Sequence, residues 1–327
     1  MKIGFNHKFE KIISLENLLR AWQRFLIGKR QRLDVQAFGA DLMNNIFSLH
    51  EDLACHNYQH GGYKAFNISD PKPRRIHKAT VRDRVVHHLL YDALYDYFDS
   101  RFIFDSYSCR KNKGAHRAMN RFKFFAGQVS KNHTKSCYVL KGDIRKFFAS
   151  IDQEILLNIL KRQIIDTEIL WLIEQVLASF NSGQPRVGLP LGNLTSQLFS
   201  NIYLNELDRY IKQELRIKYY IRYADDFVIL ADNKNELAMI IPLIKDFLSH
   251  NLKLQLHPQK LFIKTYSSGL DFLGWIHFPH HRQIRTVTKK RIFRQMAGWP
   301  QPETINSYRG LLSHGDTYKI NRELGLI

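Results

Sequence analysis

Three aspartates stand beside apolar segments of strand length, and their positions could bring their carboxylates together. Asp225 and Asp226 are adjacent at the centre of YYIRYADDFVIL, and Asp143 lies near the end of YVLKGDI. Like charges this close in a partly buried place resist joint ionisation, so something cationic should compensate them. Three carboxylates on one sheet face would suit Mg²⁺, and two such ions can stabilise both oxygens of a phosphoryl displacement. The plain alternative for Asp225 and Asp226 is a solvated turn, because Asp favours turns.

The segments around these aspartates predict the elements that must position them. YVLKGDI is typical of a strand, and YYIRYADDFVIL indicates two short strands joined in a hairpin. A helix should follow the first strand from Ser150, with Gln153 placed for a capping box. A longer helix is expected downstream, because apolar residues share one face at Leu194, Leu198, Ile202 and Leu207. Strands that alternate with helices and include an antiparallel hairpin indicate an α+β layer.

Other parts of the chain predict helices, some of them with basic faces. Apolar residues recur at helical spacing from Leu15 to about Phe47 and again from Val81 to Phe98. Between Tyr107 and Phe125, arginine and lysine are interleaved with aromatic residues. That pattern fits either a solvated helix face or a surface that contacts a nucleic acid strand.

The charge balance indicates a polyanionic partner. The 327 residues include 49 lysines and arginines against 30 aspartates and glutamates, a formal net charge of +19, and 44% are hydrophobic. The hydrophobic content is enough to build proper cores. The positive excess attracts nucleic acid through its field and through counterion release. A solvated basic surface or weak membrane attraction would also produce this balance, so motifs must decide.

Cysteine usage and the N-terminus favour a cytoplasmic protein. Cys55, Cys109 and Cys137 are too few and too scattered for a disulfide framework, and they lack the paired spacing of a structural zinc site. The first residues have no small-residue cleavage site and interrupt their apolar positions with charge, unlike a signal peptide. No apolar run approaches membrane-spanning length, so no membrane partner is expected.

The ordered blocks VLKGDIRKFFASID, YADD and FLGW resemble those of reverse transcriptases, over a span from about Pro71 to Ile284. The resemblance implies an α+β right-hand polymerase fold with fingers, a palm of antiparallel sheet plus helices, and a short helical thumb. It implies a helical N-terminal leader at 1–60, fingers and palm at 61–284, and a basic thumb at 285–327. It also implies an RNA-directed DNA polymerase in which Asp143, Asp225 and Asp226 are the catalytic ligands of two Mg²⁺ ions.

The resemblance assigns further roles around the incoming dNTP. Phe148, five positions after the first aspartate, resembles the steric gate that rejects a ribose 2′-hydroxyl, although a phenylalanine is more often simply core. Arg74, Arg75 and Arg82 fall in a stretch that resembles the first fingers block, where basic side chains clamp the triphosphate. Which of the three arginines does so is left open.

The segment GLDFLGW resembles the turn that holds the primer terminus near the metals. Leu273, Gly274 and Trp275 would form this primer grip, which acts by positioning the reacting hydroxyl. The alternative is that Leu273 and Trp275 only pack the palm.

One block departs from the pattern of most bacterial relatives, including the group II intron and retron enzymes. It reads LGNLTSQ, with Leu191 in place of a usual glutamine, followed by Gly192, and with Gln197 in place of a usual proline. This signature resembles reverse transcriptases of diversity-generating retroelements, which copy a template RNA with frequent errors opposite adenine. An apolar Leu191 would remove contacts that enforce pairing geometry at the nascent base pair, unless it merely packs a helix start. The resemblance implies a template RNA, an RNA/cDNA duplex and a small basic accessory protein as partners.

Three alternatives share parts of this pattern. A retron-like or defence-associated reverse transcriptase has the same fold and chemistry, although a retron should carry Val-Thr-Gly after FLGW, and here Thr286-Val287-Thr288 is followed by lysine. An RNA-directed RNA polymerase is disfavoured by Phe148 at the gate position. A catalytically inactive RNA-binding relative should have lost an acidic ligand, whereas all three aspartates are intact.

Overall fold

The chain divides by its internal contacts into two units, each assembled from separate stretches of sequence. The computed structural model describes residues 5, 7–69, 73–298 and 300–326. The first unit comprises Met1–Ile103, Ile144–Tyr210 and Asp246–Gln255, and the second comprises Phe104–Asp143, Ile211–Lys245 and Leu256–Ile327. The predicted leader, fingers-palm and thumb boundaries are functional divisions, and they stay a prediction.

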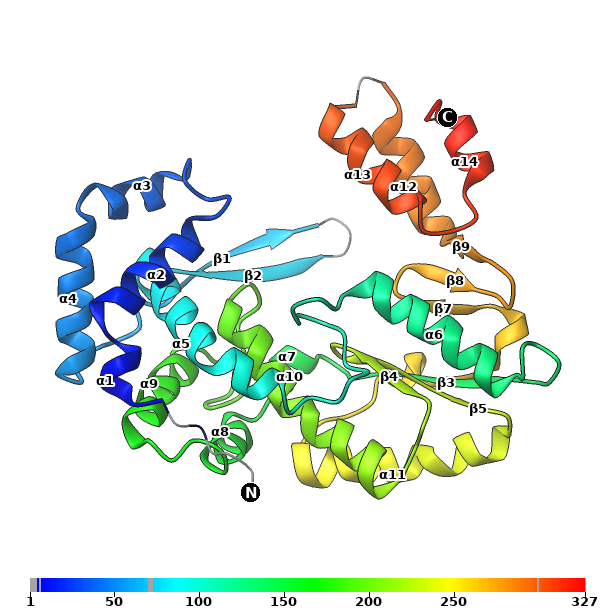
Figure 1. Ribbon diagram of the computed structural model, residues 1–327, viewed down its shortest axis with the longest axis horizontal. Helices are drawn as coiled ribbons and strands as arrows, with labels where there is room; N and C mark the ends of the chain where they lie inside the picture. The colour runs from blue at the N-terminus through cyan, green and yellow to red at the C-terminus, as the bar shows by residue number, and fades with distance from the viewer. Residues whose placement is uncertain (1–4, 6, 70–72, 299, 327) are drawn as a thin grey trace. The chain divides into compact units, whose positions relative to one another are not determined.

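The first unit is mainly helical and carries one two-stranded antiparallel hairpin. Its helices pack around α5, which contacts α1, α2, α3 and α10 (Figure 1). Its elements are α1 (Phe9–Ile12), α2 (Leu15–Leu26), α3 (Leu33–Ala40), α4 (Leu42–Ala54), β1 (Tyr63–Ile68), β2 (Arg74–Ala79), α5 (Val81–Asp99), α7 (Phe147–Ser150), α8 (Gln153–Lys161), α9 (Thr167–Ala178) and α10 (Leu194–Arg209). The predicted helices at 15–47, at 81–98 and downstream of Leu191 are confirmed.

The start of α8 corrects one prediction. The helix begins at Gln153, and its N-cap is Asp152, whose carboxylate accepts hydrogen bonds from the backbone N–H groups of Glu154 and Ile155. The expected start at Ser150 with a capping box to Gln153 is therefore wrong. Ser150 instead ends the short helix α7, and the Gln153 side chain is buried and donates to the Gly188 carbonyl at 2.9 Å.

The second unit is built on a four-stranded antiparallel sheet in the order β4-β5-β3-β6. Helix α6 lies on one side of this sheet and α11 on the other (Figure 1). A second sheet of three short strands, β7-β8-β9, precedes three C-terminal helices. The elements are α6 (Ala115–Val129), β3 (Tyr138–Asp143), the π-helix η1 (Tyr210–Glu214, of which Tyr210 is counted in the first unit), β4 (Tyr220–Tyr223), β5 (Asp226–Ala231), α11 (Lys234–Leu252, counted in the first unit from Asp246 on), the 3₁₀ turns η2 (Pro258–Lys260) and η3 (Tyr266–Ser268), β6 (Phe262–Thr265), β7 (Leu270–Phe272), β8 (Trp275–His277), β9 (Arg282–Ile284), α12 (Thr286–Met296), α13 (Pro302–Leu312) and α14 (Tyr318–Glu323).

The main sheet and α6 share one apolar core. Phe122 and Phe125 on the buried face of α6 pack against Val139 of β3 and Val228 of β5, all of them almost inaccessible to solvent. The basic and aromatic segment from Tyr107 to Phe125 therefore places its apolar members in the core. The expected strand at YVLKGDI, the hairpin around YADD and the α+β class are all confirmed.

A second core joins the small sheet to the C-terminal helices. Trp275 of β8 is 2% exposed and packs with Ile292, Tyr308 and Leu312. A Cβ added at Gly315 would overlap the Trp275 ring, so only glycine leaves room for the ring at this position. Within the described residues, no helix combines the length and apolarity needed to cross a membrane.

A buried polar chain ties α5 to α10 inside the first unit. The Tyr58 hydroxyl donates to Asp83 at 2.8 Å, and His60 Nδ1 lies 3.6 Å from the same carboxylate. His60 Nε2 lies 3.4 Å from His87 Nε2, and His87 Nδ1 lies 2.7 Å from the Thr195 hydroxyl. Burial, together with the neighbouring His60, lowers the pKa of His87 to about 3, so His87 folds as the neutral imidazole.

Folding stability should therefore fall in mild acid. Below pH ~6.5 the unfolded chain binds a proton at His87 that the folded protein does not, and each pH unit costs up to about 1.4 kcal/mol. We expect His87→Gln to flatten the fall in the free energy of unfolding between pH 6.5 and 5, measured by denaturant titration. His250→Gln, at an exposed site on α11, is the control, and equal slopes in the two variants would contradict the account.

Candidate active site

Strand pairing brings the predicted carboxylates to one end of the main sheet. In the antiparallel register of β3 with β5, Asp143 is the direct partner of Asp226. Directly opposed residues project from the same face of a sheet, with Cβ atoms about 5 Å apart. Asp225 lies in the turn between β4 and β5, beside its neighbour Asp226. The sheet therefore gathers the three aspartates that the sequence singled out.

The turn that carries Asp225 has a strained backbone, and the Arg222 side chain stabilises it. Ala224 has φ 54°, a left-handed conformation that costs a residue with a side chain about 1 kcal/mol or more. The buried Arg222 donates from its guanidinium to the Ala224 carbonyl at 3.1 Å. Such strain persists only where the surroundings over-determine it, and Arg222 supplies part of that restraint.

Two lysines compensate the carboxylates. Lys260 Nζ lies 2.9 Å from Asp143 Oδ1, and Lys141 Nζ lies 3.4 Å from Asp226 Oδ1. Burial, followed by the nearby Asp143 carboxylate, raises the pKa of Asp225 to about 6. Burial also raises the pKa of Asp226, against the opposing attraction of Lys141. The three carboxylates of the site thus outnumber the two lysine ammonium groups that neutralise them.

These side chains have the donor chemistry of a hard-cation site. Asp226 Oδ1 is buried and makes no hydrogen bond within the described part of the chain. Its near counterion is Lys141 Nζ at 3.4 Å, and a buried carboxylate oxygen without a hydrogen bond carries a desolvation cost that a directly bound cation would reduce. Among the described residues, no three Asp, Glu, His or Cys side chains already meet the geometry of a metal site. Asp143, Asp225 and Asp226 could supply carboxylate oxygens to a hard divalent cation.

The absence of a side chain at Gly142 allows the Phe227 ring to pack against β3. Gly142 is the cross-strand partner of Phe227, and a Cβ added at Gly142 would overlap the Phe227 ring. Gly142 precedes Asp143 and Phe227 follows Asp226, so this contact sits directly under the carboxylate pair. The fold therefore requires a glycine at position 142, beside the carboxylate of Asp143.

The loop that contains Leu191 is fixed to β2 in the first unit. The His77 backbone N–H donates to the Leu191 carbonyl at 2.9 Å, and the Asn193 side-chain amide donates to the His77 carbonyl at 3.1 Å. Gly192 is exposed at φ 108°, and a Cβ there would approach Ile76 to 2.8 Å. Neither hydrogen bond uses the Leu191 side chain, which is half-buried. The loop position is thus set without the side chain at residue 191.

The remaining predicted nucleotide contacts also lie in the first unit and differ in their surroundings. Arg74 and Arg75 are exposed on β2, whereas Arg82 on α5 forms an ion pair with Asp52. Phe148 in α7 is half-buried, and Gln197 in α10 is half-buried too. Because Asp52 holds Arg82, the exposed Arg74 and Arg75 are the arginines with more freedom to meet a triphosphate.

The predicted primer-grip residues form the turn of the β7-β8 hairpin in the second unit. Leu273 has φ 52° and Gly274 has φ 91°, the two positive values that a tight type I′ hairpin turn requires. Leu273 is half-buried and Gly274 is partly exposed. Trp275 points into the core of the C-terminal helices, so its side chain serves packing.

Sequence reasoning missed the two counterions. It required a cation near the aspartates but named none. Lys141 lies on β3 two positions before Asp143, a period-2 spacing that puts both residues on the same face of the strand. That signal could have identified Lys141, whereas Lys260 is distant in sequence and only the fold brings it to Asp143.

Solved structures share this architecture. A telomerase from Candida albicans in complex with a fragment of telomeric RNA aligns with 78% of this chain and 53% of its own, at 12% identity and a TM-score of 0.53. An apo telomerase from Candida tropicalis, truncated from its C-terminal domain, aligns with 68% of this chain and 55% of its own, at 13% identity and a TM-score of 0.51. The fold is therefore the right-hand polymerase fold, as the sequence predicted.

The family follows from the sequence match. The model of the family "Reverse transcriptase (RNA-dependent DNA polymerase)" matches residues 68–277, more than half of the chain. The chain belongs to the reverse transcriptase family, and it is an RNA-directed DNA polymerase by that membership.

Curated relatives agree with the family. Protein YkfC of Escherichia coli is 26% identical over 73% of this chain and 70% of its own length. The group II intron-encoded protein LtrA of Lactococcus lactis is 22% identical over 62% of this chain, and the retron Ec73 reverse transcriptase of Escherichia coli is 25% identical over 55%. The match covers 44% of the LtrA protein and 62% of the retron enzyme.

The contact under the carboxylates can be tested by adding one methyl group. Gly142→Ala should lower the free energy of unfolding by about 1–3 kcal/mol and reduce primer extension, because the Phe227 ring must move. Gly127→Ala, in α6 with the nearest atom 3.8 Å from the added Cβ, is the matched control and should be neutral or stabilising. If Gly142→Ala behaves like Gly127→Ala in both unfolding and extension assays, the packing argument fails.

Proposed function

We propose that this chain copies a template RNA into error-prone cDNA for a diversity-generating retroelement, by nucleotidyl transfer at Asp143, Asp225 and Asp226. The pairing of Asp143 with Asp226 across β3 and β5, with Asp225 in the adjoining turn, carries the proposal. Two Mg²⁺ ions are its cofactors. We place the enzyme in the cytoplasm.

The reaction is attack by the primer 3′-hydroxyl on the α-phosphate of a dNTP, with pyrophosphate as the leaving group. Mg²⁺ bound at the aspartates would stabilise charge on the attacking and leaving oxygens. Lys141 and Lys260 favour the ionised carboxylates, the form that binds a cation. Asp225 must lose its proton to take part, and its neighbours set how readily it does so.

The other residues that the sequence singled out have proposed roles in substrate binding. Arg74 and Arg75 bind the triphosphate, Arg82 contributes less because Asp52 holds it, and Phe148 rejects the ribose 2′-hydroxyl. The hairpin turn at Leu273 and Gly274 positions the primer strand, with Trp275 anchoring it in the core beneath. The net charge of +19 attracts the RNA template and the RNA/cDNA duplex. In this scheme residues 1–60 form a leader, 61–284 the fingers and palm, and 285–327 the thumb.

The retroelement assignment rests on the LGNLTSQ block. Leu191 and Gln197 depart from the residues usual in group II intron and retron enzymes, and Gly192 keeps the loop close to β2. Because hydrogen bonds to β2 hold the loop without the Leu191 side chain, an apolar residue there changes contacts with the nascent base pair and leaves the loop in place. Poorer discrimination at that base pair gives errors, concentrated opposite adenine. A template RNA and a small basic accessory protein are the partners of this function.

The retron-like alternative has one observation in its favour. Both the retron Ec73 reverse transcriptase and LtrA are relatives of this chain. A retron-like enzyme would share the three aspartates and the chemistry, but it would copy its template accurately. Fidelity therefore separates the two functions.

Removal of one carboxylate charge tests the proposed chemistry. Asp225→Asn should reduce primer extension on an RNA template with dNTPs and Mg²⁺ by at least about a hundredfold, while RNA binding in a filter assay is kept. Asp246→Asn, at an exposed site on α11, is the control and should extend normally. Unreduced extension by Asp225→Asn would remove Asp225 from the mechanism.

A side-chain exchange at residue 191 tests the proposed infidelity. Leu191→Gln should lower misincorporation opposite template adenine by about tenfold, the discrimination that ~1.4 kcal/mol of hydrogen bonding supplies. Leu191→Met keeps an apolar side chain and should keep the errors. The measurement is sequencing of cDNA made on one defined RNA template. Equal error rates for Leu191→Gln and the unaltered enzyme would overturn the retroelement assignment, and accurate cDNA from the unaltered enzyme would favour the retron-like function.

A further inference from the structure

An apolar groove opens in the second unit at the end of β5 that lies away from the carboxylates. Its floor includes Leu230 of β5 with Leu237 and Ile240 of α11, and its volume is about 550 Å³. The first residue of β5 that lines the groove is Ile229, three positions after Asp226, so the groove begins about 10 Å from the carboxylate end at ~3.3 Å per residue. The proposed transfer chemistry makes no use of this groove.

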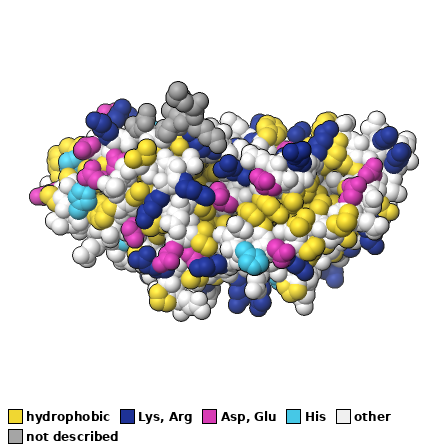
Figure 2. All heavy atoms as spheres, turned by 90° about the horizontal axis from the view of Figure 1, so that it is seen from below, with side chains coloured by type: hydrophobic (Ala, Val, Ile, Leu, Met, Phe, Trp, Pro, Cys, Tyr) yellow, Lys and Arg dark blue, Asp and Glu magenta, His cyan; other side chains and the backbone are white. Residues whose placement is uncertain are grey.

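The rim of this α11 groove exposes large apolar side chains. Met239 is 64% exposed and Leu243 is 43% exposed, and both line the groove from α11 at a spacing of four residues. Figure 2, which views the molecule from the side of α11, shows hydrophobic side chains gathered on this face with Lys, Arg, Asp and Glu around them. Apolar side chains gathered in an open hollow mark a binding surface more often than isolated exposed residues do.

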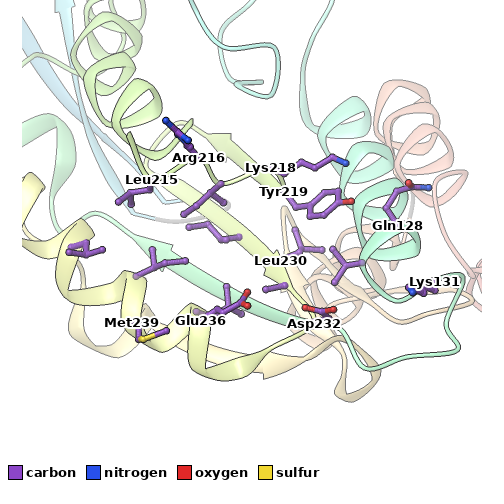
Figure 3. A pocket seen from close by; sticks show the side chains of 17 residues that line it. Gln128, Lys131, Leu215, Arg216, Lys218, Tyr219, Leu230, Asp232, Glu236 and Met239 are labelled. Atoms are coloured by element: carbon purple, nitrogen blue, oxygen red, sulfur yellow. The ribbon is translucent and has the colours of Figure 1, made fainter. Parts of the chain in front are cut away.

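The two long walls of the groove carry charges of opposite sign. Arg216 and Lys218 lie on the wall formed by residues 215–219, and Asp232 and Glu236 lie on the wall where β5 leads into α11. Figure 3 shows these two pairs on opposite sides, with Leu230 between them. Within the described part of the chain, none of the four has an ion-pair partner of opposite charge within 4.0 Å, although Lys218 lies over the Tyr219 ring. The groove thus presents a basic pair and an acidic pair on opposite sides of an apolar floor, and Lys131 is a further cation among its lining residues.

This layout complements one kind of occupant. An amphipathic helix offers an apolar stripe with a charged flank on each side, and it docks into apolar grooves through residues at i, i+3, i+4 and i+7. We propose that the α11 groove binds an amphipathic α-helix of a protein partner, with acidic residues along the flank that faces Arg216 and Lys218 and basic residues along the flank that faces Asp232 and Glu236.

Other occupants fit less well. RNA would find cations such as Arg216 and Lys218 along one wall, but its phosphates would also meet the carboxylates of Asp232 and Glu236 and an apolar floor. A second copy of this chain carries the same net charge of +19, so the two would repel each other. A helix with mixed flanks satisfies both walls at once, and it also covers Met239 and Leu243.

The test uses a fluorescein-labelled helical peptide of about 18 residues, five turns, with a leucine stripe, glutamate on one flank and lysine on the other. Fluorescence anisotropy with the full chain should give a dissociation constant of about 10 µM or below. Arg216→Glu/Lys218→Glu should weaken binding at least tenfold, and so should Met239→Asp. Lys161→Glu/Lys245→Glu, at exposed sites outside the groove, is the charge-matched control and should bind normally.

Reversal of both walls gives the sharpest outcome. When Asp232→Lys/Glu236→Lys is added to Arg216→Glu/Lys218→Glu, the peptide should bind again, because a helix laid in the opposite direction exchanges its two flanks. Each variant should keep its thermal unfolding midpoint and primer extension, which separates this site from the polymerase site.

Four results would overturn the proposal. The peptide could fail to bind below about 100 µM, or it could bind with the same affinity to every variant. The dye anilinonaphthalene sulfonate could bind the groove in a Met239-dependent way while the peptide does not, which would make the groove a small-molecule site. Sedimentation could show a dimer that Met239→Asp dissociates, which would make a second copy the occupant.

Discussion

The antiparallel pairing of β3 with β5 sets the Asp143 carboxylate opposite that of Asp226, and the electrostatic cost of that arrangement shapes everything around it. Two like charges at this separation destabilise a sheet unless cations offset them. Lys260 and Lys141 supply part of the offset, yet the pKa of Asp225 is still raised and Asp226 Oδ1 still makes no hydrogen bond in the described structure. A folded site in which lysines only partly neutralise the carboxylates favours the binding of a further cation.

The fold accepts local penalties to hold this arrangement. Because Gly142 has no side chain, the Phe227 ring can pack directly beneath the carboxylates. Ala224 keeps a left-handed conformation, and the buried guanidinium of Arg222 donates to its carbonyl. Departures from local preference that are supported by neighbouring side chains are expected where a protein positions reacting groups. Strand β5 thus carries the proposed chemistry at its first residue and leads to an unrelated apolar groove at its last.

Sequence alone predicted the parts of this structure that depend on local patterns. The strand ending at Asp143, the YADD hairpin and the long helices follow from residue periodicity, and the ordered blocks identified the family. Features that depend on distant residues could not be predicted. Lys260 reaches Asp143 only through the turn before β6, and Asp52 and Arg82 are 30 residues apart in sequence and meet only in the folded chain. The start of α8 was misplaced because the Asp152 side chain caps it more directly than the expected capping box.

The proposed mechanism requires the three aspartates to form one metal-binding site. Its most direct measurement is anomalous diffraction from crystals of the enzyme bound to an RNA template, a DNA primer and a non-reactive dNTP analogue, soaked in Mn²⁺ as a substitute for Mg²⁺. We expect two anomalous peaks, each within about 2.5 Å of a carboxylate oxygen of Asp143, Asp225 or Asp226. Peaks that contact none of these oxygens, or no peak at all beside a well-ordered nucleotide, would contradict it.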